Sequence, residues 1–259
     1  MHAIDFSSMP VLGEAESKKT PASTPSLDKS HFDFSALNEA EEGERIFSAE
    51  EEWLKSRWGR FTSSEINRLL ALTDDGSLSD GAETYCMEKA AEMLTEFAPN
   101  TYTSRAMEWG NEKEPYAVQH FIDEMMMPLE KINDNQEFVL SDDGTWGGTP
   151  DGVSPSDLDY GLEVKCPNST THISYRTQIK CGATLKKMKP IYYWQVQSLM
   201  YLCKKTKWYF MSYDPRFIKR EHQSHIVLIE RNDDDIEYML RKIQLAVIRR
   251  DMLVAQMDI

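Results

Sequence analysis

The stretch of sequence that decides the fold reads GTPDGV at residues 148–153 and GLEVKCP at residues 161–167. Side chains in a β-strand alternate between two faces, so Leu162 and Val164 are expected to enter the core while Glu163 and Lys165 share the other face. Asp151 belongs to a Pro-Asp-Gly turn signal just before this strand. We therefore expect the Asp151 and Glu163 carboxylates to meet around a hard divalent cation, with the Val164 backbone carbonyl as a third ligand.

Lys165 completes this candidate site. An ammonium group beside a cation can position or deprotonate an attacking water, and it can stabilise charge that develops on a phosphate. Each half of the motif alone is typical of an ordinary turn or of a half-buried strand. The combination of an Asp turn with an acidic strand position beside a lysine favours a metal-dependent nuclease.

Composition divides the 259-residue chain into two parts. Residues 1–48 are rich in Ser, Thr, Pro, Ala and Glu and poor in large apolar side chains, which predicts a disordered acidic extension. Residues 49–259 are long enough to bury one core, so one folded domain is expected there. Residues 1–52 carry 12 acidic and 4 basic side chains, which leaves −6 of the total charge of −14 for the rest.

A basic stretch stands out within this acidic chain. Residues 176–220 contain 11 basic side chains and a single acid, Asp214. A solvated helix face with loop lysines is the ordinary interpretation, and contact with DNA is the functional one. If the stretch binds DNA, the acidic remainder would confine the DNA to one channel.

The cysteines and the hydropathy indicate a cytoplasmic protein. Four cysteines lie far apart, with no Cys-x-x-Cys pair and no signal peptide ahead of them, so they are expected to be reduced thiols in or near the core. No apolar run approaches the roughly 18 residues that a membrane span needs. We expect no membrane association, and a location in the cytoplasm of a bacterial host cell.

The segment before the motif is expected to bind an anion. Residues 50–72 favour two helices joined by a turn, the second opened by a capping box over residues 62–65. Such a helix start would present backbone N–H groups and the hydroxyls of Thr62 and Ser64 to a phosphate. Arg57 could add a charged fork. An ordinary N-cap is the alternative interpretation.

A further helix is expected within residues 104–127. Pro115 indicates either that this helix starts near Asn111 or that it kinks there. In both cases Glu114 lies near a helix start and could point at the cation. Tyr116 is among the side chains expected on the buried face of this helix.

Strands and helices alternate through the rest of the chain. Strands are predicted over residues 137–140 and 146–148, which form a hairpin, and over 162–165, 207–212 and 224–230; helices are predicted over 81–96, 190–203 and 234–257. The strand over residues 162–165 is expected to continue the sheet of the hairpin. The order of elements predicts an α/β or α+β domain with a central mixed sheet flanked by helices.

Several motifs follow one another in a characteristic order. They are WxxxR at 53–57, TxSE at 62–65, WGxxxE at 109–114, TPDG at 149–152, GLEVKCP at 161–167, QVQ at 195–197 and WYFxxYDPR at 208–216. Over residues 53–231 the chain thereby resembles the phage lambda exonuclease family, with its YqaJ-like viral recombinases, within the PD-(D/E)XK nuclease superfamily. The resemblance implies a restriction-endonuclease-like core assembled into a ring-shaped homotrimer around DNA.

The resemblance also implies roles for individual residues. Asp151 and Glu163 would hold the metal, Lys165 would be the catalytic lysine, and Glu114 would be a further acid beside the metal. Either Asp142 or Asp143 would match another acidic position. The DNA residues implied by the family are Arg57, Ser64, Thr149 and Gln195, which would grip the 5′ phosphate, and Met107, which would act as an apolar wedge at the DNA end.

The implied activity is hydrolysis of double-stranded DNA from its 5′ ends. Two Mg²⁺ ions per active site, which Mn²⁺ would replace, would support 5′-to-3′ release of mononucleotides and leave 3′ single strands for recombination. A single-strand annealing protein would be the partner. A structure- or sequence-specific endonuclease of the same superfamily is the alternative enzyme, and an end-binding scaffold without turnover is the alternative from another class.

Overall fold

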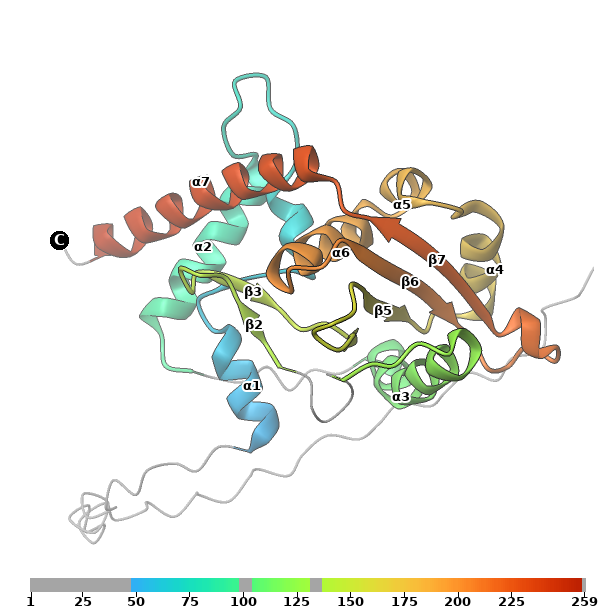
Figure 1. Ribbon diagram of the computed structural model, residues 1–259. Coiled ribbons are helices and arrows are strands. Elements are labelled where there is room, and N and C mark those ends of the chain that lie inside the picture. Colours follow the sequence, from blue (N-terminus) through green and yellow to red (C-terminus); the bar gives the residue numbers. More distant parts are fainter. Residues whose placement is uncertain (1–47, 98–103, 131–136, 258–259) are drawn as a thin grey trace, which may run out of the picture. The chain divides into compact units, whose positions relative to one another are not determined.

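The computed structural model describes residues 48–97, 104–130 and 137–257. The predicted extension over residues 1–48 lies outside the described residues except for Ser48, and it stays a prediction. Among the helices of the described part, none is long and apolar enough to cross a bilayer. Figure 1 labels the helices and strands of the folded part of the chain.

Most of the predicted elements occur in their predicted order, and the structure adds strands over residues 61–62 and 152–153 and helices over residues 169–178 and 182–188 that were not predicted. In chain order they are α1 (Ala49–Arg57), β1 (Phe61–Thr62), the 3₁₀ helix η3 (Ile66–Leu69), α2 (Asp80–Leu94), α3 (Arg105–Met125), β2 (Val139–Leu140), β3 (Trp146–Gly148), β4 (Gly152–Val153), β5 (Gly161–Lys165), α4 (Ser169–Gln178), α5 (Gly182–Met188), α6 (Pro190–Leu202), β6 (Lys207–Tyr213), the 3₁₀ helix η5 (Arg220–His222), β7 (Ser224–Glu230) and α7 (Asp233–Met257).

A four-stranded mixed sheet has the order β4-β5-β6-β7. β5 and β6 are parallel, and their connection runs through α4, α5 and α6, because parallel neighbours need a long crossover. The edge strand β4 pairs antiparallel with β5, and the edge strand β7 pairs antiparallel with β6. Gly161 begins β5 opposite Trp208, and a Cβ at Gly161 would lie 2.3 Å from the tryptophan ring. Only glycine allows these two strands to approach at that point.

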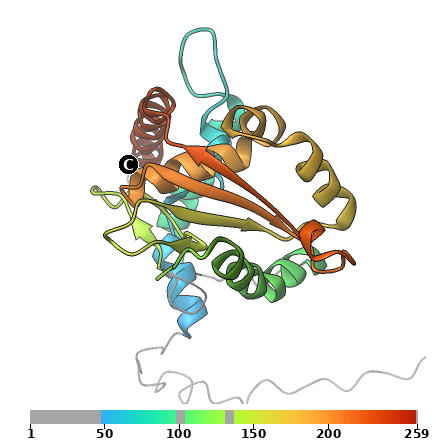
Figure 2. The same cartoon turned by 45° about the vertical axis from the view of Figure 1, so that its right-hand side comes forward.

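The two faces of this sheet are covered by different helices (Figure 2). Leu162 and Val164 of β5 pack with Val118 and Phe121 of α3 in one apolar cluster, as the alternation of the sequence predicts. Phe210 of β6 points to the other face and belongs to the larger core that includes α6. Each fully buried apolar side chain contributes roughly 1.5–3 kcal/mol, so both layers are held mainly by burial.

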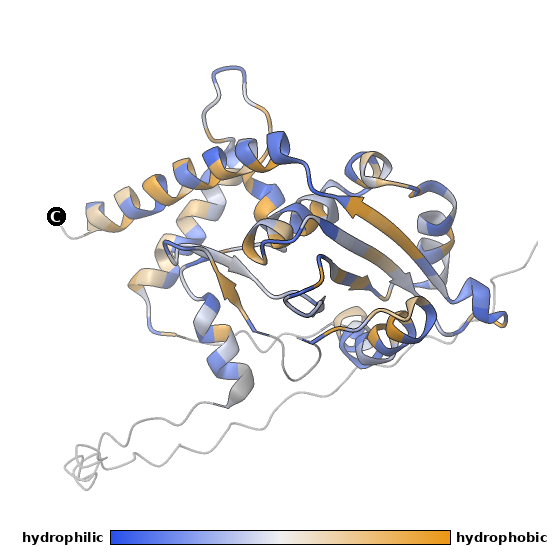
Figure 3. Ribbon diagram, viewed as in Figure 1, coloured by the Kyte–Doolittle hydropathy of each residue, from blue (hydrophilic) through white to orange (hydrophobic). Residues whose placement is uncertain are grey.

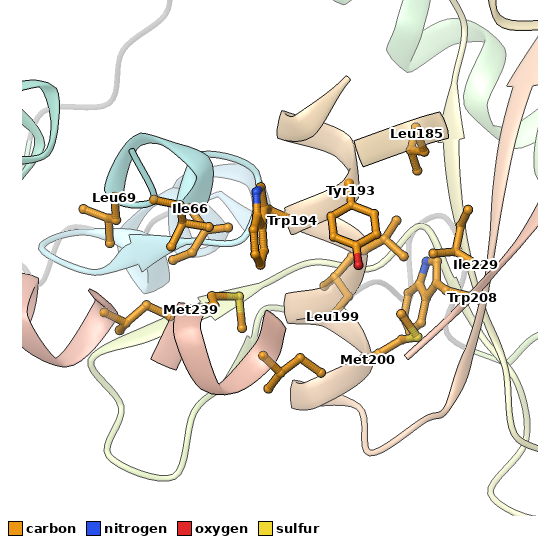
Figure 4. Packing of buried hydrophobic residues seen from close by; sticks show 14 of the residues in the cluster. Ile66, Leu69, Leu185, Tyr193, Trp194, Leu199, Met200, Trp208, Ile229 and Met239 are labelled. Carbon is orange, nitrogen blue, oxygen red and sulfur yellow. The ribbon is translucent and has the colours of Figure 1, made fainter. Parts of the chain in front are cut away.

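Helix α6 is the centre of the larger core (Figure 4). Trp194 faces Ile66 of η3 and Met239 of α7 on one side, while Tyr193 lies on the side of Trp208 and Ile229. The helix starts at Pro190, where a missing N–H costs nothing. Because α6 is apolar nearly all round, the polar side chains that it buries require a separate explanation.

The hairpin of β2 and β3 belongs to a second sheet, of order β1-β3-β2. The hairpin itself was predicted correctly, with β2 and β3 antiparallel. The expectation that β5 continues the same sheet was wrong. β1 pairs in parallel with β3 instead, a long-range contact that spacing along the chain does not reveal.

The prediction of two helices over residues 50–72 was also wrong. Only α1 forms, and its capping box lies at Ser48 and Glu51 rather than at residues 62–65. The chain turns at Gly59 with a positive φ of 71° and enters β1, followed by the four-residue η3. Pairing with β3 therefore overrides the local helical signal.

Helix α3 begins well before Asn111, so the first alternative that Pro115 suggested, a start near Asn111, was wrong. Ser104 caps it by accepting a hydrogen bond from the Met107 backbone N–H, so the helix begins at Arg105 and carries Pro115 inside. Glu114 consequently lies in the middle of the helix and not near its start. Tyr116 is 63% exposed, so its expected place on the buried face was wrong.

Polar and apolar residues separate as expected for this layered arrangement (Figure 3). α7 shows apolar positions along one side and polar ones along the other, and its first turn contains three aspartates, which complement the helix dipole. All four cysteines are free thiols. Cys86 is buried and two others are partly buried, but Cys181 is exposed, contrary to the expected place near the core.

Candidate active-site cleft

A cleft of about 440 Å³ opens where α3, α6 and the end of β5 meet. Its lining residues are Ser64, Ala106, Met107, Gly110, Asn111, Glu114, Val164, Lys165, Cys166, Pro167, Tyr192 and Gln195. Six of them were singled out from the sequence: Ser64, Met107, Glu114, Val164, Lys165 and Gln195. We name this cavity the active-site cleft.

The predicted carboxylates converge beside this cleft. Asp151 precedes β4, and its Oδ2 accepts a hydrogen bond of 2.6 Å from the Val164 backbone N–H. Glu163 is fully buried on the face of β5 opposite Leu162 and Val164. The Lys165 ammonium donates a short hydrogen bond to Glu163 Oε1. Turn and strand therefore bring Asp151, Glu163 and Lys165 into one site, as the sequence predicts.

The electrostatics of the site follow from this burial. Burial raises the pKa of Asp151 well above its usual range, and the negative charges of Glu163 and Glu114 raise it further. Burial also raises the pKa of Glu163, although the Lys165 ammonium pulls it back down. For Lys165, burial lowers the pKa, but Glu163 and Asp151 more than offset this, so its pKa is raised and the side chain is protonated.

One oxygen of the site is left without a protein partner. Glu163 Oε2 is buried and makes no hydrogen bond among the described residues that meets normal geometry. The Gln195 side chain is close enough to Glu163 to lower its pKa. A buried carboxylate oxygen of this kind costs free energy unless it meets a hydrogen-bond donor or a cation. Two neighbouring carboxylates with raised pKa values are the donor set that a hard divalent cation neutralises.

A complete side-chain cage for a metal is absent from the described residues. No three His, Cys, Asp or Glu side chains there are grouped closely enough to hold an ion. The site offers two carboxylates, and it would need backbone oxygens and water to complete a coordination shell. This composition suits Mg²⁺, which keeps several waters, better than Zn²⁺.

Tyr192 of α6 is a cleft residue that the sequence analysis missed. The Lys165 ammonium lies 5.2 Å from the centre of the Tyr192 ring, a cation–π contact. That ring stacks in turn on Phe210, with centroids 5.8 Å apart. Tyr192 sits three residues before Gln195, so helical spacing could have placed both on one face.

Helix α3 supplies the opposite wall of the cleft. Met107, Asn111 and Glu114 recur at helical spacing and line the same cavity. Met107 is 52% exposed, so it is accessible from solvent at the mouth of the cleft. The sequence indicated Asn111 only as a helix start, yet the same spacing argument would have put it beside the cleft.

The predicted phosphate-binding residues fall into two adjoining groups. Ser64 and Gln195 line the cleft, and the Ser64 hydroxyl lies 3.3 Å from that of Thr62. Arg57 and Thr62 line a separate pocket of about 170 Å³. Thr62 thus belongs to that pocket while its hydroxyl reaches Ser64 at the cleft.

Trp53 connects the second group to the Asp151 turn. Its indole N–H donates to the Thr149 hydroxyl over 3.1 Å, and the Arg57 guanidinium lies 4.3 Å from its ring centre. Burial lowers the pKa of Arg57, against the opposing effect of nearby acidic side chains such as Glu65. Arg57 and Thr149 therefore both contact the Trp53 side chain, next to the Asp151 turn.

Neither Asp142 nor Asp143 lines the cleft. Asp143 accepts hydrogen bonds from Ser141 and Thr145 within the β2–β3 turn. Asp142 lines another cavity, beside Lys204. The structure thus gives Asp143 a local role in the turn, and Asp142 lies beside Lys204 in the other cavity.

The basic stretch over residues 176–220 is not one solvated face. Lys205 is buried, and its ammonium donates to the backbone carbonyls of Pro155 and Leu158. Lys186 binds both oxygens of Asp235 at 2.7 Å. The ammonium groups of Lys205 and Lys186 therefore form intramolecular contacts that stabilise the fold.

Comparison with known proteins agrees with this architecture. The family model described as YqaJ-like viral recombinase domain matches residues 52–206. A search of curated proteins found no match. Among solved structures, that of an alkaline exonuclease (LHK-Exo) from Laribacter hongkongensis has a TM-score of 0.65 at 24% identity, covering 80% of this chain and 96% of that chain.

Two further structures are similar. LHK-Exo in complex with dAMP has a TM-score of 0.66 at 24% identity and covers 80% of this chain and 95% of that one. A phage-related exonuclease from Haemophilus somnus has a TM-score of 0.62 at 18% identity and covers 76% and 96%. These likenesses confirm the predicted fold class, an α+β domain with a mixed sheet flanked by helices.

Proposed function

This chain belongs to the family of YqaJ-like viral recombinase domains, and from that premise we propose that it is a Mg²⁺-dependent exonuclease that digests double-stranded DNA from 5′ to 3′. The observation that carries the proposal is the convergence of Asp151, Glu163 and Lys165 at one cleft. The similarity of the fold to structures described as exonucleases supports it. The dAMP bound to LHK-Exo supports mononucleotide products.

The carboxylates of the cleft fit a divalent cation. Asp151 and Glu163 would hold Mg²⁺, with Mn²⁺ as a substitute, and the Val164 carbonyl would add a ligand; we extend the proposal to two ions per site. The orphaned Glu163 Oε2 and the raised pKa of Asp151 support this assignment. When bound, such a cation stabilises charge on phosphoryl oxygens and makes water a better nucleophile.

The protein's own groups have separate tasks in hydrolysis. Lys165 is protonated, and Glu163 and the Tyr192 ring restrict where its ammonium lies. An ammonium held in this way stabilises negative charge that develops on the phosphate, so we assign it that role rather than the role of a general base. Glu114 adds a negative charge from α3 to the same cleft.

Selection of ends would come from the 5′ phosphate. Arg57, Thr62, Ser64, Thr149 and Gln195 would bind it, and Met107 would separate the terminal base pairs. A guanidinium recognises a phosphate through paired hydrogen bonds, which a 5′-OH end cannot return. Arg57→Ala should therefore reduce the preference for 5′-phosphorylated over 5′-OH ends by roughly tenfold, about 1.4 kcal/mol. An unchanged preference in initial-rate assays would refute the phosphate pocket.

The remaining parts of the proposal concern assembly and context. We propose a homotrimeric ring, in which the DNA passes a positively charged lumen while the outside stays acidic. The 3′ single strands would be used for recombination with a single-strand annealing protein in the cytoplasm of a bacterial host. Mass measurement in solution tests the trimer directly.

Three substrates incubated with the protein and Mg²⁺ test the activity. We expect rapid digestion of a linear duplex with 5′ phosphates, slow digestion of the 5′-OH duplex and none of a covalently closed circle. Release of a label at the 5′ end as a mononucleotide, before release of a label at the 3′ end, would establish the polarity of digestion. Addition of EDTA should stop digestion of both linear duplexes.

Two other results would replace the proposal. Nicking or linearisation of the circle would indicate the alternative, a structure- or sequence-specific endonuclease with the same carboxylates. Binding of DNA ends without digestion would indicate a scaffold protein. Glu163→Gln serves as the control for contaminating nucleases, because it should abolish digestion by this chain.

A further inference from the structure

We propose that Arg216 and its basic neighbours Lys113 and Arg220 form a second DNA-binding site, which holds backbone phosphates of the strand next to the active-site cleft. We call these three residues the basic corner. The inference rests on the proposed function, because it assigns another contact to the same substrate.

The buried carboxylate of Asp214 holds the Arg216 guanidinium in a fixed orientation. Asp214 is fully buried and follows directly after β6. Its two oxygens accept hydrogen bonds from Arg216 Nε and Nη2 at 2.7 and 2.9 Å. The Ser169 hydroxyl also binds Asp214, at 2.7 Å. This paired geometry orders the guanidinium before any ligand arrives, which lowers the entropy lost on binding.

Arg216 is fixed from the side as well. Its guanidinium carbon lies 4.5 Å from the centre of the Trp109 ring. The arginine side chain is nevertheless 46% exposed. Among the described residues Nη1 has no hydrogen-bond acceptor, so one donor-bearing nitrogen stays available to a ligand. A guanidinium presented in this way matches a phosphate oxygen.

Two more cations lie near neighbouring aromatic side chains, Lys113 at Trp109 and Arg220 near Tyr213. Lys113 lies 4.9 Å from the centre of the Trp109 ring. Burial raises the pKa of Tyr213, and the positive charges of Lys113 and Arg220 partly offset that rise. Burial lowers the pKa of His120, and Arg220 lowers it further. Side chains from α3 and from the β6–β7 connection therefore bring three cationic groups together, of which Lys113 also pairs with Glu112 at 2.6 Å.

This corner adjoins the cleft. Lys165 pairs with Ser212 in the parallel sheet, so the residues after β5 and β6 leave the sheet at the same edge. Pro167 lines the cleft, and its carbonyl accepts a hydrogen bond of 3.2 Å from Arg216 Nη2. Figures 1 and 2 show the β6–β7 connection beside α3, and Figure 3 shows it mostly hydrophilic.

A nucleic-acid backbone is the ligand that fits this arrangement. It carries regularly spaced negative charges, and a strand whose scissile phosphate occupies the cleft must continue past one of its rims. A purely structural tie between Arg216 and Asp214 would not require the Arg216 side chain to stay 46% exposed, nor two further cations in the same region. Phosphate contacts position the strand without reading its sequence.

The test measures DNA binding without cleavage. Fluorescence anisotropy with a labelled 5′-phosphorylated duplex in EDTA gives Kd at a series of NaCl concentrations for the full chain. Arg216→Gln should weaken binding by roughly tenfold and reduce the slope of log Kd against log [NaCl] by about one unit, the loss of one phosphate contact. Unchanged Kd and slope would overturn the proposal.

Arg231→Gln is the matched control. Like Arg216, Arg231 binds a carboxylate, that of Asp233 at 2.7 Å, and lies near an aromatic ring, that of Tyr201 at 5.9 Å. Its backbone N–H donates to the carbonyl of Thr206, just before the first residue of β6, so it lies at the end of β6 opposite to Arg216. Its variant should bind DNA like the wild type. An equal effect of both variants would reduce the basic corner to general electrostatics and overturn its assignment.

A second variant covers the case in which Arg216→Gln does not fold. Lys113→Gln combined with Arg220→Gln leaves Asp214 and its partners intact, and it should also reduce the salt slope; an unchanged slope would overturn the proposal. Because binding in EDTA needs no hydrolysis, these outcomes stay separate from the proposed activity. A wild type that binds DNA but never digests it would refute the exonuclease and leave the basic corner supported.

Discussion

One face of β5 packs Leu162 and Val164 against α3, whereas the other face buries Glu163 beside Lys165 under α6. On the α3 face Leu162 and Val164 pack with Val118 and Phe121, and this apolar packing contributes to stability, although Glu114 of the same helix lines the cleft. On the α6 face a charged group lies where an apolar one would hold the fold better. The difference indicates that the protein tolerates an electrostatic cost on the face where the chemistry takes place.

Removal of the ammonium should have the largest effect. Lys165→Ala should reduce the cleavage rate on linear duplex by on the order of 10³-fold, since charge on the phosphate then lacks its stabilising group. Binding of DNA should be spared. Lys205→Met is the control, because the ammonium of Lys205 donates to the backbone carbonyls of Pro155 and Leu158 and its loss should affect stability instead. Near-normal cleavage by Lys165→Ala would contradict the division between the two faces.

A substitution on the apolar α3 face of β5 should lower the stability and leave the cleavage rate nearly unchanged. Phe121→Ala removes a fully buried ring that lies 5.3 Å from that of Tyr209. We expect the free energy of unfolding to fall by about 3–5 kcal/mol in urea titrations. The cleavage rate per folded molecule should change little at low temperature. A large loss of rate without loss of stability would show that the α3 face takes part in the chemistry.

Two glutamines on α6 sharpen the comparison within one helix. Gln197 is fully buried and binds the Glu230 carbonyl and the Asn232 N–H, each at 2.9 Å, so Gln197→Leu should cost about 1–3 kcal/mol of stability. Gln195 lines the cleft beside Glu163, so Gln195→Leu should lower the cleavage rate and spare the melting temperature. Thermal melts and initial cleavage rates measured on both variants show whether each glutamine contributes to stability or to cleavage. Identical profiles for the two would contradict the assignment of Gln195 to the site.

The smallest effect concerns the repulsion between the carboxylates. The pKa of Asp151 is raised in the folded state, so the folded protein holds the proton more tightly than the unfolded chain. In EDTA, stability should therefore fall as pH rises above the ordinary aspartate pKa. Asp151→Asn should remove this loss and raise Tm at pH 8 by about 2–4 °C, roughly 1 kcal/mol. Parallel Tm curves for both proteins, measured upward from the ordinary aspartate pKa, would show that the repulsion is not significant.

Local spacing was sufficient where a motif is continuous. The alternation in GLEVK fixed which side chains of β5 face α3, and the nearby Asp turn put Asp151 next to them. The strands β6 and β7 and the helices α6 and α7 were also predicted within a residue or two. In these segments the hydrophobic period and the burial requirement point to the same structure.

Local spacing failed where a distant partner decides. The helical pattern after Gly59 yields to pairing of β1 with β3, in which Phe61 lies opposite Trp146, and Pro115 is accommodated inside α3. Asp142 and Asp143 could not be separated by sequence, and in the structure neither lines the cleft.

The sequence by itself determined the motif, the fold class and the three groups at the turn and on β5, because these groups all lie between residues 151 and 165. Only the tertiary structure brought Tyr192, Asn111 and the Arg216 side chain to the same region. Their elements meet because each must bury its apolar face against the sheet, and the position of a polar side chain at the rim follows from that packing.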